Sequence, residues 1–237
     1  MRRNELGQPI GDPVEGWIPP GTPPREVMPG RYCTLEPLSV DRHAGDLWAA
    51  NELDPDGRNW TYLAYGPFAS FDEYREWCGA MAEGPDPLFF AIVVGGRAVG
   101  AAAYLRIAPA AGSIEVGHVN YSPLLQRTVA ATEAMYLMMR RAFELGYRRY
   151  EWKCDALNAS SRQAAQRLGL SYEGIFRNAV VTKGRNRDTA WYAAIDREWP
   201  PLRDAFEQWL DPSNFNRDGA QRIRLSDLTA PIVGRRG

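Results

Sequence analysis

The alternation of strand-like and helix-like segments between residues 31 and 210 constrains the fold more than any other feature of this 237-residue chain. Apolar runs at 88–94 and 97–107 are separated by Gly95 and Gly96, the pattern of two antiparallel strands joined by a tight turn. Periodicity predicts further strands at 30–38, 113–119, 149–155, 175–181 and 189–195. Helical spacing and capping residues predict helices at 41–51, 71–83, 129–145, 158–168 and 200–210. This order predicts a mixed α/β domain with one core.

The two ends of the chain differ from this pattern. Residues 8–30 are dominated by proline and glycine, which cannot sustain a helix or a central strand. We therefore expect residues 1–30 to form an extended arm and residues 31–210 to form the domain. The tail, residues 211–237, is polar and is expected to pack loosely.

Composition excludes several classes of protein. The 28 Lys and Arg nearly balance the 29 Asp and Glu, so bulk charge recruits neither nucleic acid nor an anionic membrane. Three widely spaced cysteines and two histidines argue against a disulfide framework and a metal site. No apolar run approaches the roughly 20 residues of a membrane span, and the start lacks a signal-peptide core. A cytoplasmic protein is expected.

Four ordered segments carry a more specific pattern. Residues 114–117 read IEVG, 126–134 read QRTVAATEA, 158–170 run from NASS to RLGL, and 173–199 contain EGIFR, DT and EW. In the same order, these segments resemble the IEIG strand, the QGxGxxTEA pyrophosphate loop, the NxxS…RLGF helix and the EGxxR…DT…EW ending of the GNAT (GCN5-related) acyl-CoA-dependent N-acyltransferases. The branch that contains the ribosomal-protein alanine acetyltransferases is the most similar. The resemblance covers residues 31–200.

The resemblance implies a fold and a cofactor site. The fold is a central, mixed but mostly antiparallel sheet that splays at one parallel pair, formed by 113–119 and 149–155, with helices on both faces. The pantetheine arm of acetyl-CoA lies between those two strands, and the pyrophosphate lies at the strand-to-helix junction, where free N–H groups and the helix dipole favour anions. The implied cofactor contacts are Val116, Gly117, Val119, Gln126, Arg127, Thr128, Val129, Ala130, Ala131, Thr132, Asn158 and Ser161. For Asn158 and Ser161, an N-cap and a polar first turn are the alternative.

This chain also departs from the family pattern. Arg127 and Val129 stand where the family has glycine, which predicts a loop with helical or extended φ. Arg127 and Thr128 add a cation and a hydroxyl suited to phosphate. In many relatives a tyrosine at the position of Ala165 donates the proton to the leaving thiolate. In this chain that proton must come from Ser160, Ser161, Tyr121 or water.

N-acyl transfer requires an amine that has lost its proton. The resemblance places Glu115 at the position of the general base; the alternative is an exposed strand carboxylate. His118 is a second candidate, but strand alternation puts it on the opposite face unless a β-bulge at Gly117 re-aims it.

The acceptor site is predicted from an aromatic segment at 59–68. Trp60, Tyr62 and Tyr65 are candidates for contacts with an amine, or else they seal the core. The basic segment 183–187 is predicted to be a hairpin turn, either solvated or facing an anionic acceptor.

The predicted function is transfer of acetyl from acetyl-CoA to a primary amine, of a small molecule or a protein N-terminus, by direct attack in a ternary complex. The alternative is a non-catalytic acyl-CoA-binding module of the same fold, suggested by the loss of both loop glycines. No metal, nucleic acid or membrane partner is expected, and a homodimer is plausible from the resemblance and the long arm.

Overall fold

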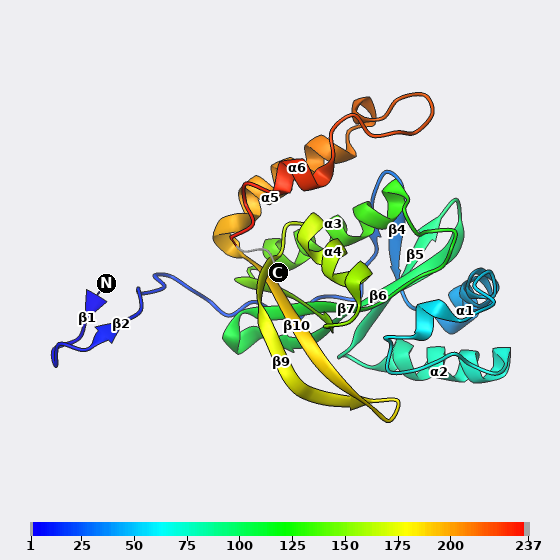
Figure 1. The fold of residues 1–237 in the computed structure, drawn as a ribbon, viewed down its shortest axis with the longest axis horizontal. Coiled ribbons are helices and arrows are strands. Elements are labelled where there is room, and N and C mark those ends of the chain that lie inside the picture. The colour runs from blue at the N-terminus through cyan, green and yellow to red at the C-terminus, as the bar shows by residue number, and fades with distance from the viewer. Residues whose placement is uncertain (1, 235–237) are drawn as a thin grey trace.

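The computed structural model describes residues 2–234 and is built around an eight-stranded sheet of order β3-β4-β5-β6-β7-β8-β10-β9 (Figure 1). Its strands are β3 (Met28–Pro29), β4 (Thr34–Pro37), β5 (Leu88–Val94), β6 (Arg97–Ala108), β7 (Ser113–Tyr121), β8 (Arg149–Asp155), β9 (Ser171–Thr182) and β10 (Arg185–Ile195). Neighbouring strands are antiparallel, except that β7 and β8 run parallel. The predicted mixed, mostly antiparallel sheet with one parallel pair is confirmed.

Helices cover both faces of the sheet (Figure 1). On one face lie α3 (Val129–Glu144) and α4 (Ala159–Arg167), and on the other α1 (Val40–Asn51) and α2 (Phe71–Glu83) lie against β5 and β6. The C-terminal α5 (Trp199–Leu210) packs on α3 and on the short α6 (Leu225–Thr229). Short 3-10 helices η1 (Arg58–Trp60), η2 (Pro109–Ala111), η3 (Asp196–Glu198) and η4 (Pro212–Asn214) connect these elements.

Capping side chains set the starts of the helices. The Ser70 hydroxyl accepts from Glu73 N at 3.3 Å before α2, and Thr128 Oγ1 accepts from Ala131 N at 3.1 Å before α3. Each cap satisfies an N–H group that has no partner within its helix.

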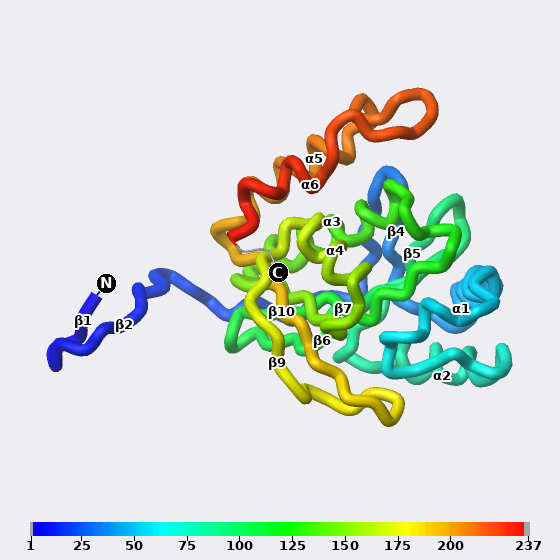
Figure 2. The backbone as a smooth tube through the Cα atoms, viewed as in Figure 1, coloured from blue at the N-terminus to red at the C-terminus, as the bar shows by residue number. Residues whose placement is uncertain are grey.

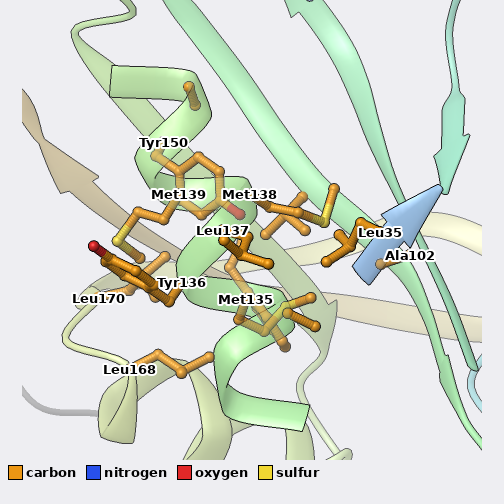
Figure 3. Packing of buried hydrophobic residues seen from close by; sticks show 14 of the residues in the cluster. Leu35, Ala102, Met135, Tyr136, Leu137, Met138, Met139, Tyr150, Leu168 and Leu170 are labelled. Atoms are coloured by element: carbon orange, nitrogen blue, oxygen red, sulfur yellow. The ribbon is translucent and has the colours of Figure 1, made fainter. Parts of the chain in front are cut away.

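The buried face of α3 is rich in methionine. Met135, Met138 and Met139 are 3%, 0% and 1% exposed. Figure 3 shows them among Leu137, Leu35, Tyr150, Leu168 and Leu170, side chains from several elements. Flexible thioethers fill such irregular interiors well, so packing accounts for these residues.

The hairpin of β9 and β10 differs from the prediction. Both strands are longer than expected, and the turn consists of Lys183 and Gly184 alone, with φ of 49° and 73°. The predicted turn over 183–187 is wrong, because residues 185–187 continue β10 and pair with residues 180–182 of β9. Positive φ at both turn residues is typical of the turn that matches strand twist.

The two ends of the chain pack differently. The short strands β1 (Arg2–Arg3) and β2 (Pro9–Ile10) lie apart from the sheet (Figure 2), whereas Gly21 O accepts from the Tyr147 hydroxyl at 3.1 Å. The polar tail is predicted to pack loosely, but Leu225 is fully buried in the main core. The boundaries at 30 and 210 stay predictions. Within residues 2–234, no helix combines the length and apolarity that crossing a membrane requires.

Candidate active site

The parallel pair β7 and β8 separates part-way along its length. Pairing runs from Ser113 opposite Arg149 to Val116 opposite Trp152, and in the described chain no later residue of β7 pairs with β8. The outer edges of the two strands remain paired with β6 and β10. Main-chain groups on the inner edges are therefore free to bind an extended ligand laid between the strands. The splay predicted at 113–119 and 149–155 is present.

A β-bulge interrupts β7 beside this splay. Ala101 of β6 pairs with Asn120 and Ala103 pairs with Gly117, which leaves an extra residue on β7, and His118 has φ of 50°. The bulge turns the imidazole onto the face that carries α1 and α2, where Glu115 also lies. The His118 ring lies 5.0 Å from the Phe89 ring. The β-bulge on which the His118 prediction depended is therefore present, and the role of His118 as a base stays a prediction.

Burial sets the protonation state of His118. Desolvation, followed by the charge of Arg106, lowers its pKa from 6.5 to about 4, although Asp86 opposes this shift. The imidazole is therefore neutral at neutral pH and has a lone pair available to accept a proton.

Glu115 is buried and fully engaged in ion pairs. Its side chain is 4% exposed, with both oxygens 2.8 Å from Arg106 Nη1 and one oxygen 2.8 Å from Lys153 Nζ. Burial raises its pKa, while Lys153 and Arg106 act in the opposite direction. The alternative of an exposed strand carboxylate is wrong, and the role of general base stays a prediction.

A chain of alternating charges extends from Glu115 across the sheet. Lys153 Nζ lies 2.7 Å from Glu151, whose carboxylate also pairs with Arg149 at 2.6 Å, and Arg149 continues to Glu173 at 2.5 Å. The sequence analysis did not single out Lys153. Its signal is the alternation of Arg149, Glu151 and Lys153 along one face of a strand beside Glu115.

The loop before α3 keeps a left-handed residue. Arg127 has φ of 60° and is exposed. The prediction of helical or extended φ is therefore wrong at this position, because arginine takes the conformation that glycine adopts freely. The loop therefore keeps a left-handed residue at this position and adds a guanidinium.

The start of α3 offers further donors. Thr128 Oγ1 donates to Leu125 O at 2.7 Å while capping the helix, and the first-turn N–H groups at Val129 and Ala130 have no acceptor within the helix. Val129 packs on the main core. The Thr128 hydroxyl is thus already used, whereas the N–H groups of Val129 and Ala130, together with Arg127, fit a pyrophosphate.

Other predicted cofactor residues already have partners within the protein. Gln126 Nε2 donates to Asn59 Oδ1 and to Tyr121 O, both at 2.8 Å, and Thr132 accepts from Arg167 at 3.0 Å. Thr132 is 4% exposed, so it holds α3 against α4.

At the start of α4, Asn158 and Ser161 make contacts within the protein. Asn158 Oδ1 accepts from Ser161 N at 3.1 Å, and Ser161 Oγ accepts from Trp152 Nε1 at 2.9 Å. The N-cap is confirmed, while cofactor contacts of both residues stay predictions. Ala165 is fully buried, and burial strongly raises the pKa of Tyr121, whose hydroxyl donates to Ala131 O at 3.0 Å.

The aromatic segment beside the splay divides into two parts. Trp60 is 6% exposed and belongs to the core under α1 and α2, so it seals that core. The Tyr65 ring lies 4.4 Å from the tilted Trp77 ring and stacks against His118 at 5.6 Å. Tyr62 is 37% exposed, and its hydroxyl donates to Leu157 O at 3.4 Å.

Three hydrogen bonds, called here the frame contacts, connect the segments around the ends of β7 and β8. Asn59 Nδ2 donates to Tyr121 O at 3.0 Å at the end of β7, and Lys183 Nζ of the hairpin turn donates to Trp60 O at 2.7 Å. Ala156 N, just after β8, donates to Asp188 O at 2.8 Å. These contacts connect the aromatic segment, the hairpin and both splayed strands.

Known proteins resemble this chain in sequence and in fold. Residues 33–171 match the family model of the acetyltransferase (GNAT) domain. The chain belongs to the GNAT family of acetyltransferases. A GCN5-related N-acetyltransferase from Brucella melitensis is 43% identical, with a TM-score of 0.89 over 92% of this chain and 100% of that one.

Two further solved structures show the range of the likeness. A probable GNAT acetyltransferase from Chromobacterium violaceum ATCC 12472 is 39% identical, with a TM-score of 0.76 over 81% of this chain and 98% of that one. RimL, a ribosomal L7/L12 alpha-N-protein acetyltransferase, is 19% identical, with a TM-score of 0.63 over 76% and 99%, a likeness of fold alone. A search of curated proteins found no match.

Proposed function

We propose that this GNAT protein transfers acetyl from acetyl-CoA to a primary amine, of a small molecule or a protein N-terminus, by direct attack within a ternary complex. The observation that carries the proposal is the splay of β7 and β8 beside a helix start that presents free donors. Main-chain groups of Val116, Gly117 and Val119 would bind the pantetheine arm, as in strand addition.

The pyrophosphate would lie against the start of α3. Arg127 supplies a cation, and the first-turn N–H groups of Val129 and Ala130 supply donors at the positive end of the helix dipole. Asn158 and Ser161 would approach the cofactor from the start of α4.

In the transfer, the amine nitrogen bonds to the thioester carbonyl carbon, and the carbon–sulfur bond breaks. The amine attacks as its free base. After the attack its positively charged nitrogen gives one proton to the protein, and the departing thiolate takes up one proton. We propose His118 as the proton acceptor, because it is neutral and has no hydrogen bond within the described chain, whereas Glu115 carries three. Glu115 would then position Arg106 and Lys153 beside the site.

No covalent intermediate on the protein is required. Cys154 is 5% exposed, and burial raises the pKa of its thiol, which opposes formation of a nucleophilic thiolate. Catalysis would come mainly from positioning the two substrates and from main-chain N–H groups directed at the carbonyl oxygen.

Calorimetric titration with acetyl-CoA, followed by thiol release across a panel of amines, tests the proposal. Binding and amine-dependent release of CoA are expected. Absence of binding would overturn it, while binding without release from any amine would favour the non-catalytic module.

A homodimer and a cytoplasmic location are also proposals, the first motivated by the resemblance and the long arm. Light scattering that detects only monomers would contradict the homodimer. Recovery of the native protein in a membrane or secreted fraction would contradict the location.

A further inference from the structure

Arg187 lies on the same face of the sheet as the charge chain that contains Glu115. Ala190 and Tyr192 of β10 point into the main core. Alternation therefore places Arg187 and Trp191 on the opposite face. On that face Lys153 Nζ, the partner of Glu115, lies 3.8 Å from the centre of the Trp191 ring.

The position of Arg187 along β10 brings it beside the splay. The last residue of β8, Asp155, pairs with Thr189, so Arg187 lies beyond the end of β8 and pairs with Val180 of β9. Along the hairpin, it falls between the two frame contacts made by Lys183 and Asp188. Figure 1 shows this part of the hairpin extending past the sheet on the side of α2.

Two donors on this face have no acceptor. Arg187 Nε and Trp191 Nε1 are both buried and without a hydrogen-bond partner, and within residues 2–234 Arg187 makes no ion pair. Guanidinium and indole groups can only donate, so another oxygen atom must satisfy them. The side chain of Arg187 is only partly buried, which leaves its terminal nitrogens accessible.

Three nearby carboxylates, by contrast, are already satisfied. Glu115 and Glu151 share Lys153, and each also binds an arginine. Asp188 accepts from Asn178 N at 2.7 Å and from Asn186 Nδ2 at 3.1 Å. Asp155, on this face by alternation along β8, accepts from Leu157 N at 2.8 Å, so the face offers mainly donors and positive charge to a ligand.

We infer that the acceptor carries an anionic group, a carboxylate or a phosphate, near its amine, and that Arg187 binds this group. The inference rests on the proposed amine transfer and names the acceptor class. A planar guanidinium binds either anion through two parallel hydrogen bonds, and the partial burial of Arg187 strengthens such a pair. An acceptor whose charge is purely cationic, such as a polyamine, lacks an acceptor group for these donors.

Matched amines provide the test. O-phosphoethanolamine is compared with ethanolamine, and glycylglycine with glycylglycinamide, by thiol release from acetyl-CoA. We expect at least about tenfold higher kcat/KM for the anionic member of one pair, mainly through KM, and the pair that responds identifies phosphate or carboxylate. Arg187→Gln is expected to reduce that preference by about tenfold to a hundredfold, as for hydrogen bonds to charged groups.

Arg197→Gln is the matched control, because Arg197 is exposed in η3 at the other end of β10 and makes no ion pair within the described residues. It should keep the preference. Equal kcat/KM within both pairs, or an unchanged preference in Arg187→Gln, would overturn the inference.

Binding separates this inference from the proposed function. The same amines are titrated calorimetrically into the protein saturated with CoA, where no transfer takes place. Tighter binding of an anionic member that Arg187→Gln abolishes supports the inference even if acetyl-CoA releases no thiol, a result that would reject only the transfer. Equal, Arg187-independent binding of all members rejects the inference alone.

Discussion

At the scale of single residues, Arg127 adopts a left-handed conformation that glycine takes more easily. Its φ of 60° costs roughly 1 to 2 kcal/mol for a residue with a Cβ atom. The flanking structure supplies the compensation, since Leu125 N donates to Ser122 O at 2.9 Å on one side and Thr128 caps α3 on the other. The arginine therefore carries both charge and strain.

Comparison of Arg127→Gly with Arg127→Ala separates these two properties. Both variants remove the cation and should bind CoA more weakly, with the larger loss at low salt. Only glycine relieves the strain, so we expect Arg127→Gly to be about 1 kcal/mol more stable than Arg127→Ala in urea denaturation. Equal stability would contradict the assigned conformation.

The pH dependence of transfer tests the choice of base. With a pKa of about 4, His118 is already deprotonated above pH 5, so the rate should rise with pH only as the amine loses its proton. His118→Gln should lower kcat/KM by about tenfold to a thousandfold across this range. The measurement is thiol release between pH 5 and 9.

Glu115→Gln is the comparison for that experiment. If Glu115 only positions its cationic partners, this variant should lose less activity than His118→Gln and keep the same pH profile. An unchanged kcat/KM in His118→Gln, with a large loss in Glu115→Gln, would reassign the base to Glu115.

The sequence predicted some site residues and missed others for a physical reason. Glu115 and His118 belong to a strand whose sequence pattern resembles the family, and the structure brings them to one face. Arg106 and Lys153, which the sequence did not indicate, come from other strands. Their proximity depends on register and on the bulge in β7, which residue spacing within one strand does not reveal.

At the scale of elements, strong local patterns gave correct boundaries. The apolar run of β5 and the alternating pattern of β8 match their observed bounds, as does α2 after its Ser70 cap. The hairpin was predicted too short, because residues 171–174 of β9 and 185–188 of β10 are mostly polar and lack apolar alternation. Pairing between the strands, rather than burial, keeps them extended.

The anchoring of α3 provides an element-scale prediction. Glu133 is 5% exposed, and its carboxylate accepts from the N–H groups of Arg31, Tyr32 and Cys33 at 2.8, 2.6 and 2.8 Å. Glu133→Gln replaces an acceptor oxygen by a donor, so it should destabilise the fold by about 2 to 3 kcal/mol in urea denaturation. It should also weaken CoA binding, because the same helix begins at the pyrophosphate loop.

Glu144→Gln is the control at the other end of α3, where the side chain is 59% exposed and pairs with Arg140 at 3.8 Å. Exposed pairs of this kind contribute little, so a change below about 0.5 kcal/mol is expected. Gly30→Ala should resemble Glu133→Gln, because an added Cβ would lie 2.4 Å from Glu133 Oε2. Similar losses in the two glutamate variants would contradict the anchoring role.

At the scale of the whole molecule, the resemblance predicted the sheet and its splay, but composition alone did not. Near-neutral net charge gives no sign of the chain of alternating charges that crosses β6 to β9, because opposite charges cancel in the sum. The arrangement appears only when the order of strands and their register are known.

Lys153 is central to that arrangement and is 7% exposed. Lys153→Met leaves Glu115 and Glu151 buried without their shared cation, so at pH 7 we expect a loss of about 3 to 5 kcal/mol. In the native protein, the lowered pKa of Glu151 means that its stabilisation is present above its unfolded pKa and is lost as pH falls. In the variant, protonation of the carboxylates relieves their repulsion.

The stability difference between native protein and variant should therefore narrow between pH 7 and pH 4, as measured by urea denaturation at both values. Lys153→Arg keeps the charge and should lose less. A difference that stays constant with pH would show that lost packing, rather than charge, dominates.

The charge chain also links the edge of the sheet to its centre. Arg149 divides its hydrogen bonds between Glu151 and Glu173 of β9, and Glu151 shares Lys153 with Glu115. Free-energy coupling is reciprocal. A molecule that binds Arg149 in place of Glu173 would therefore alter the proton affinity of Glu115. Protonation of Glu115 would alter the affinity for that molecule by the same factor.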